Sequence, residues 1–281
     1  MKLNLFVVAA VAGAAYSTPM ERREFNTSGG DGPYGPGQLF TETSLPQHTI
    51  YMPSKPGNAS LPVLVWGNGG CSAEGDSNSE LLNQIASYGY LAIASGSPGQ
   101  QGNTTSQQMT ESITWAVANA GKGAYANVDA TKIMAAGFSC GGIQAYDQIW
   151  DSRVATIGIF SSGLLTNTTA ASSFNKPILY CLGGTTDIAY ENGERDFDNL
   201  PANTPSWKGN LDVGHGGTLY DVNGGLFGKA GLNWIQWVFR DDAAGKAYLQ
   251  SGYTADGWQV ETHALDQLKP SAKGNGTRRF S

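Results

Sequence analysis

A serine lies between two glycines in the pentapeptide Gly137-Phe138-Ser139-Cys140-Gly141. An apolar run over residues 132–136 predicts a buried strand before it, and apolar side chains recur at helical spacing over residues 143–150. Between a strand and a helix, G-x-S-x-G presents the serine hydroxyl as a nucleophile on a sharp turn. Glycine at both flanking positions removes side chains that would collide there. The same pattern also occurs in ordinary glycine-rich turns, so other residues must support a catalytic interpretation.

Cys140 is the second nucleophilic side chain of this turn. If Cys140 were the nucleophile, Phe138 would occupy the position two residues upstream, which is too crowded for a large ring. Ser139 has glycine at both equivalent positions, so we predict that Ser139 is the nucleophile.

A serine nucleophile requires a base and an acid that orients it. The chain has three histidines. His48 precedes the first strong strand, and His263 lies near the C-terminus. His215 lies in a glycine-rich loop, residues 213–217, before the last strong helix and well after the serine, as the order Ser, acid, His requires. We therefore predict His215 as the base.

The acid is expected between Ser139 and His215, after a strand. Asp187 follows the apolar run over residues 177–182 and a short glycine-containing turn, so we predict that it orients the base. A compatible role for Asp187 is capping of a helix over residues 188–195. The rivals are Asp196 and Asp198, which have no strand before them, and Asp212, which is too near His215 in the chain.

An oxyanion site would use the amide after the nucleophile and one from the loop after an earlier strand. The first amide belongs to Cys140. The second belongs to Gly69 or Gly70, which lie after the strand over residues 61–66 and which the sequence does not distinguish.

The glycines after this strand could also indicate a dinucleotide-binding loop, but the sequence does not fit one. Ser72 stands where such a loop has its third glycine, and the next strand ends without the acidic residue that would bind a ribose. The scattered histidines show no metal-ligand spacing. We predict no cofactor and no metal.

Strands and helices alternate along the chain, which predicts an α/β fold with a mostly parallel sheet and helices on both faces. Residues 38–52 are expected to add one or two edge strands. The remaining predicted strands cover residues 61–66, 91–95, 132–136, 154–160 and 177–182, and the predicted helices cover residues 79–88, 110–120, 143–150 and 228–240. Sites in such sheets lie at the carboxyl ends of the strands. Residues 161–176 are too few for a large lid, so we predict an open cleft.

We predict that Asn68 and Trp207 line this cleft, together with Trp66, for which core packing is the favoured role.

The N-terminus is typical of a secretory signal, with Lys2 before an apolar run that is too short to span a bilayer. We predict a signal peptide over residues 1–17, an N-terminal extension over 18–40, the main domain over 41–249 and a C-terminal extension over 250–281. Glycosylation sequons support secretion; they begin at Asn26, Asn58, Asn103, Asn167 and Asn275.

Three cysteines in an oxidising compartment allow one disulfide. Cys71 and Cys140 each lie beside a predicted catalytic loop and are the expected pair, with Cys181 buried and free. Three buried thiols remain the alternative. The net charge of −6 and the lack of a basic cluster in the core of the chain argue against nucleic acid as a partner, and the basic residues of the C-terminal tail form only a short segment. We expect a monomer without stable membrane association.

Taken together, the strand before Asn68-Gly69-Gly70, the serine pentapeptide, Asp187 and Gly214-His215-Gly216 resemble the α/β-hydrolase family over about residues 45–245. Within it, the chain is similar to secreted fungal hydrolases related to dienelactone hydrolases, chlorophyllase-like esterases and polyester hydrolases. Dienelactone hydrolases use cysteine where this chain has Ser139, so their substrates are not implied. The resemblance implies a serine esterase that forms an acyl-enzyme intermediate. A peptidase or acyltransferase with the same triad is one alternative, and a silent binding or effector protein is another.

Overall fold

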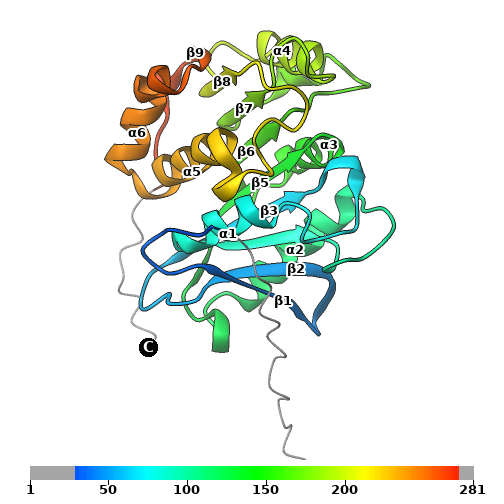
Figure 1. The fold of residues 1–281 in the computed structure, drawn as a ribbon, viewed down its shortest axis with the longest axis vertical. Coiled ribbons are helices and arrows are strands. Elements are labelled where there is room, and N and C mark those ends of the chain that lie inside the picture. Colours follow the sequence, from blue (N-terminus) through cyan, green and yellow to red (C-terminus); the bar gives the residue numbers. More distant parts are fainter. Residues whose placement is uncertain (1–28, 272–281) are drawn as a thin grey trace, which may run out of the picture.

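The computed structural model describes residues 29–271. The predicted signal peptide and the sequons at Asn26 and Asn275 lie outside these residues. A single sheet runs through the molecule with its strands in the order β1-β2-β4-β3-β5-β6-β7-β8-β9 (Figure 1). The strands are β1 (Gly37–Glu42), β2 (Leu45–Pro53), β3 (Leu61–Gly67), β4 (Leu91–Ser95), β5 (Val128–Phe138), β6 (Val154–Phe160), β7 (Ile178–Leu182), β8 (Ser206–Asn210) and β9 (Gln259–His263).

The sheet is mostly parallel, as the sequence predicts. β4, β3, β5, β6, β7 and β8 pair in parallel, whereas β1, β2 and β9 add antiparallel strands at the two sides. β1 is an edge strand, and β2 lies between β1 and β4. Because neighbouring parallel strands end at one edge of the sheet, the loops after β3, β5, β6, β7 and β8 are brought together there.

Helices cover both faces of the sheet (Figure 1). The helices are α1 (Ser79–Ser87), α2 (Ser106–Asn119), α3 (Cys140–Asp147), α4 (Tyr190–Asp198), α5 (Gly225–Arg240) and α6 (Ala243–Gln250). One apolar core joins α1, α5 and α6 to the sheet, and a second core joins α2, α3 and α4 to it. Each core buries large aliphatic and aromatic side chains, which supplies the main driving force for folding.

The helix boundaries follow local capping. α2 begins at Ser106, ahead of the predicted Thr110, because Thr105 and Gln108 form a reciprocal capping box. α1 ends before Gly89, whose φ of +85° suits the residue after a helix. α3 begins directly at Cys140, so the predicted helix over residues 143–150 starts earlier and finishes in a short 3₁₀ turn.

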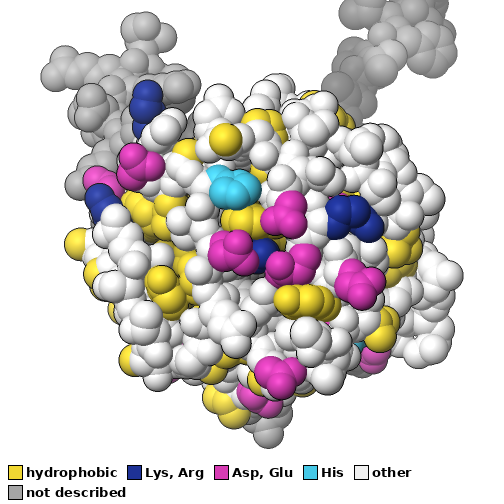
Figure 2. All heavy atoms as spheres, turned by 90° about the horizontal axis from the view of Figure 1, so that it is seen from above, with side chains coloured by type: hydrophobic (Ala, Val, Ile, Leu, Met, Phe, Trp, Pro, Cys, Tyr) yellow, Lys and Arg dark blue, Asp and Glu magenta, His cyan; other side chains and the backbone are white. Residues whose placement is uncertain are grey.

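The C-terminal segment completes the sheet. β9 pairs antiparallel with β8 within the region predicted as an extension, and neither β8, β9 nor α6 is expected from the sequence. Figure 2 looks onto the end of the molecule near α4, β8 and β9, where acidic side chains gather around basic ones. The buried Lys208 of β8 forms ion pairs with Glu194 of α4 and Glu261 of β9. Lys208 therefore ties these three elements together.

Candidate active site

Ser139 lies on the turn between β5 and α3, at the edge of the sheet where the parallel strands end. Its φ of 53° and ψ of −121° are unfavourable for a residue with a side chain. The conformation is held from two sides, because the Ser139 amide donates to the Phe160 carbonyl at 3.0 Å and the Ser162 hydroxyl donates to the Ser139 carbonyl at 2.7 Å. The Ser139 turn (residues 137–141) is thus fixed by the end of β6.

The two glycines of the Ser139 turn are required by close backbone contacts. A Cβ on Gly137 would lie 2.3 Å from the carbonyl carbon of Gly141. A Cβ on Gly141 would lie 2.0 Å from the carbonyl oxygen of Gly67, at the end of β3. These contacts agree with the steric argument made from the sequence.

His215 lies in the loop after β8, and its imidazole connects Ser139 to Asp187. Its Nε2 is 3.0 Å from the Ser139 Oγ, and its Nδ1 is 2.7 Å from the Asp187 Oδ1. The His215 side chain is 26% exposed and the Asp187 side chain is 0% exposed. The structure therefore brings the three predicted residues into one hydrogen-bonded chain that leads from the surface to a buried carboxylate.

The Asp187 carboxylate is held by several donors. The amide of Ala189 donates to Oδ1 at 2.9 Å, and the amide of Gly183 donates to Oδ2 at 3.0 Å. Burial raises the pKa of the Asp187 carboxyl, but the hydrogen bonds outweigh burial and lower the pKa below its usual value. In decreasing order of effect, the donors are the Ala189 amide, His215, the Ser161 hydroxyl and the Gly183 amide. Asp187 is thereby kept ionised, as an acid facing an imidazole must be.

Asp187 is not the N-cap of the next helix. α4 begins at Tyr190, and Ala189 occupies the cap position without a side-chain cap. The carboxylate nevertheless bonds the Ala189 amide, so Asp187 orders the start of α4 as well as facing His215.

The other candidates for the base and the acid make contacts outside the site. His48 is buried in β2 with Nε2 2.8 Å from the Gln108 carbonyl oxygen, and His263 of β9 stacks on Phe197. Asp196 is buried and accepts from the Tyr146 hydroxyl at 3.0 Å.

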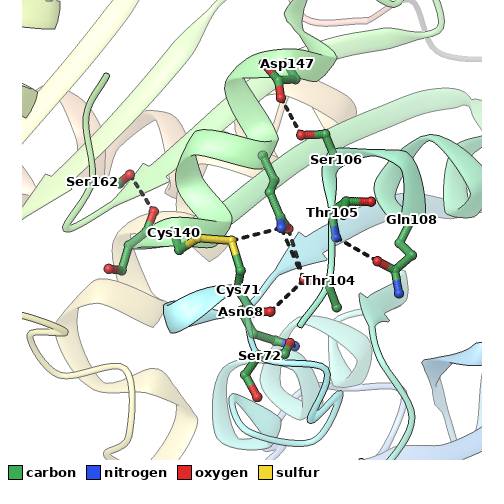
Figure 3. Close-up of a disulfide and its surroundings, with 12 residues drawn as sticks. Asn68, Cys71, Ser72, Thr104, Thr105, Ser106, Gln108, Cys140, Asp147 and Ser162 are labelled. Atoms are coloured by element: carbon green, nitrogen blue, oxygen red, sulfur yellow. Dashed lines mark hydrogen bonds between the residues drawn. A yellow bond between two sulfur atoms is a disulfide. The ribbon is translucent and has the colours of Figure 1, made fainter. Parts of the chain in front are cut away.

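The predicted disulfide between Cys71 and Cys140 is present, and Cys181 is buried and free. The bond joins the short 3₁₀ turn Gly69–Cys71 to the first residue of α3 (Figure 3). The Cys140 amide belongs to the first turn of α3, where N–H groups have no acceptor within the helix. On the other loop, a Cβ on Gly69 would lie 2.4 Å from the Phe138 ring, whereas the Cβ position of Gly70 is open. The two loops predicted to supply oxyanion donors are covalently linked beside Ser139.

The prediction that Asn68 and Trp207 line the cleft is wrong, and for Trp66 the core-packing role is the one observed. Trp66, Trp207 and Asn68 are all buried, so none of them presents a side chain to a cleft. Trp66 packs against Phe160 in the core, and Trp207 packs against Trp258. The two N–H groups of the Asn68 side-chain Nδ2 are shared among the carbonyls of Ser72, Glu74 and Ser95, which lie 2.8–3.1 Å away, so this side chain fixes the loop after β3.

The sequence analysis missed the aromatic side chains beside His215 and several exposed apolar side chains near the site in the chain. The Phe138 ring lies 5.1 Å from the His215 ring and 6.3 Å from the Tyr220 ring. Large apolar side chains next to the site in the chain are exposed, namely Ile188 (81%), Val213 (45%) and Tyr220 (61%). Each lies within five residues of Asp187 or His215, and that proximity is the signal that could have identified them.

Further observations bear on compartment and cofactors. Among residues 29–271, no group of three or more His, Cys, Asp or Glu side chains is placed to bind a metal ion. No helix in the same range is long and apolar enough to cross a membrane. Asn58, Asn103 and Asn167 are exposed, as glycosylation would require.

No protein-family model matches the chain, and no curated protein matches it in sequence. The geometry of Ser139, His215 and Asp187 is therefore the main guide to function.

Proposed function

We propose that the protein is a secreted serine hydrolase of the α/β-hydrolase family that cleaves a carboxylic ester. The observation that carries this proposal is the continuous chain of hydrogen bonds from the Ser139 hydroxyl through His215 to the buried Asp187. A strand–turn–helix around the serine, with the chain order Ser, Asp, His, supports the family assignment.

In the first step, Ser139 Oγ attacks the ester carbonyl carbon and the His215 Nε2 accepts the hydroxyl proton. The ionised Asp187 accepts the hydrogen bond of Nδ1–H, which fixes the tautomer and stabilises the imidazolium. The imidazolium then donates its proton to the departing alkoxide, and an acyl group remains on Ser139. Because the buried carboxylate has a lowered pKa, it stays ionised during these proton transfers.

The tetrahedral intermediate carries a negative oxygen that needs donors. The Cys140 amide is one donor, since it directly follows the nucleophile and begins a helix. An amide of the Gly69–Cys71 turn is the second, and the disulfide holds that turn against α3. Such preorganised donors contribute about 3 kcal/mol each to transition-state stabilisation in related chemistry.

In the second step, water replaces the alcohol. The partly exposed His215 removes a proton from this water, whose oxygen attacks the acyl carbonyl. The imidazolium then returns a proton to Ser139 Oγ as the C–Oγ bond breaks, which releases the carboxylic acid and restores the free enzyme. The exposed Ile188, Val213 and Tyr220 favour an ester with apolar groups beside the scissile bond, because such groups remove apolar side chains from water.

The disulfide and the exposed sequons support the secreted part of the proposal, because disulfides persist in oxidising compartments and sequons are glycosylated on the secretory route.

The test is turnover of short-chain p-nitrophenyl esters by the wild-type protein and by Ser139→Ala. We expect wild-type turnover, and a loss on the order of 10⁴-fold or more in Ser139→Ala. Ser112→Ala removes a buried hydroxyl on α2 and serves as the control that retains activity. Turnover that survives in Ser139→Ala would contradict the proposed nucleophile, and absence of any wild-type turnover would contradict the esterase.

A further inference from the structure

Ser161, directly after β6, is a buried serine in an unfavourable backbone conformation. It is 0% exposed and has a φ of 42°. The left-handed region is costly for a residue with a Cβ, so it persists only where the surroundings require it. The Ser161 amide donates to the Cys181 carbonyl of β7 at 2.8 Å, which fixes the backbone there.

The Ser161 hydroxyl faces the Asp187–His215 pair. It accepts a hydrogen bond from the Gly216 amide at 3.3 Å, and Gly216 directly follows His215. Its interaction with the Asp187 carboxylate is also one of the effects that lower the pKa of that carboxyl against the effect of burial. A hydroxyl has one donor and two acceptor lone pairs, so the bond accepted from Gly216 leaves the O–H of Ser161 free to point toward Asp187.

The residues on either side of Ser161 hold the nucleophile in a similar way. The Phe160 carbonyl accepts from the Ser139 amide, and the Ser162 hydroxyl donates to the Ser139 carbonyl. In the segment Phe160-Ser161-Ser162, the two outer residues therefore hydrogen-bond the backbone of Ser139, and Ser161 between them contacts the loop of His215.

We propose that Ser161 is a positioning residue that locks the His215 loop against Asp187 through its single hydroxyl. The inference rests on the proposed serine hydrolase function, because it assigns Ser161 a role in the same site. Ser161 does not touch the Ser139 hydroxyl or a substrate in this arrangement. It acts by fixing the distance between the acid and the base.

The first test compares Ser161→Ala and Ser161→Gly with Ser112→Ala. Glycine tolerates a positive φ, so Ser161→Gly removes the hydroxyl without adding backbone strain. This variant should therefore fold even if Ser161→Ala does not. Ser112→Ala removes another buried hydroxyl that makes one hydrogen bond, to the Gln108 carbonyl of α2. The concentration of competent sites is measured by titration with a fluorophosphonate, so that kcat refers to folded protein.

We expect kcat to fall about three- to tenfold in both Ser161 variants, with KM changed less than about twofold, as for loss of one hydrogen bond that acts through the base. Ser112→Ala should retain both constants. Unchanged kcat per titrated site in Ser161→Gly would overturn the positioning role, as would a rise in KM alone.

The second test is independent of activity. The proton between His215 Nδ1 and Asp187 should give a downfield proton NMR signal, assigned by its loss in His215→Gln. We expect this signal to broaden or move upfield in Ser161→Ala and Ser161→Gly but not in Ser112→Ala, and an unchanged signal would overturn the inference. If the wild-type protein hydrolyses no ester, the proposed function fails, while this signal still decides whether Ser161 positions the pair.

Discussion

The disulfide between Cys71 and Cys140 joins the loop after β3 to the residue that follows Ser139. The surroundings of Cys71 are ordered as well. Its carbonyl accepts from the amide and the hydroxyl of Thr104, and the Gln144 side chain donates to its sulfur at 3.0 Å (Figure 3). One covalent bond therefore braces both loops that we propose as sources of oxyanion donors.

Loss of this disulfide is predicted to lower both stability and kcat. The bond closes a loop with a sequence separation of 69, for which chain entropy gives a stabilisation of about 4 kcal/mol. The variant Cys71→Ser/Cys140→Ser should therefore unfold at lower urea concentration and show reduced kcat. Reductant supplies the control, because it should lower the Tm of the wild-type protein but not that of the double variant. Equal Tm values for wild type with and without reductant would refute the structural role.

Replacement of Gly141 by alanine is predicted to destabilise the fold. The new Cβ would meet the Gly67 carbonyl, which cannot move without disturbing β3. We expect a loss of about 3 kcal/mol, typical of overpacking. The matched control is Gly57→Ala, where φ is +53° and the Cβ would have no neighbour within 4 Å, so the loss should be about 1 kcal/mol. Urea unfolding measures both, and equal losses would argue against the backbone contact.

The pH dependence of stability should report on Asp187. Burial raises the pKa of its carboxyl, but the hydrogen bonds lower it more, so the folded protein binds this proton less tightly than the unfolded chain. The ionised group thus stabilises the fold above the unfolded pKa of about 3.9, and this contribution is lost as pH falls through the lower folded pKa. Unfolding by urea should show a steeper loss between pH 5 and pH 3 for wild type than for Asp187→Asn. Parallel curves for the two proteins would contradict the lowered pKa.

Tyr220 is predicted to affect acyl-chain preference. Its exposed ring lies edge-on to Phe138, close to His215. Tyr220→Ser should lower the ratio of kcat/KM for p-nitrophenyl butyrate over acetate by about fourfold, the effect of losing the burial of one of the two additional CH₂ groups, at about 0.8 kcal/mol. Tyr220→Phe keeps the ring and should keep the ratio, and Val117→Ser, an exposed change on α2, should also leave it unaltered. An unchanged ratio in Tyr220→Ser would remove this ring from the substrate site.

The local sequence predicts much of the fold because short apolar runs with glycine after them mark buried parallel strands. β4 and β6 occupy the residues expected, as does most of β3. The positions of Ser139, Asp187 and His215 could be chosen because chain order and flanking glycines restrict them. Their distances follow only from the way in which β5, β7 and β8 line up in the sheet.

The missing elements depend on contacts between distant residues. The sequence of β8, Ser-Trp-Lys-Gly-Asn, is largely polar and does not predict a buried strand. Lys208 is nevertheless buried, because Glu194 of α4 and Glu261 of β9 neutralise its charge. β9 is largely exposed and has no apolar pattern of its own. The place of Ser161 directly after a predicted strand is the only signal that its local sequence offers, because its contact with the Gly216 amide depends on how β6 and the loop after β8 meet. Trp207 points into the core, as Trp66 does, because the direction of a tryptophan side chain depends on the pleat of its strand in the sheet and not on how near it lies to a catalytic loop in sequence.

Covalent labelling tests the central claim most directly. A fluorophosphonate reacts only with a serine that a neighbouring base activates, so the adduct reports the nucleophile without any choice of substrate. After labelling of the wild-type protein, peptide mass spectrometry should find the adduct on Ser139, and labelling should be lost in Ser139→Ala and strongly slowed in His215→Gln. An adduct on another residue, or no adduct on folded wild-type protein, would contradict the proposed role of Ser139.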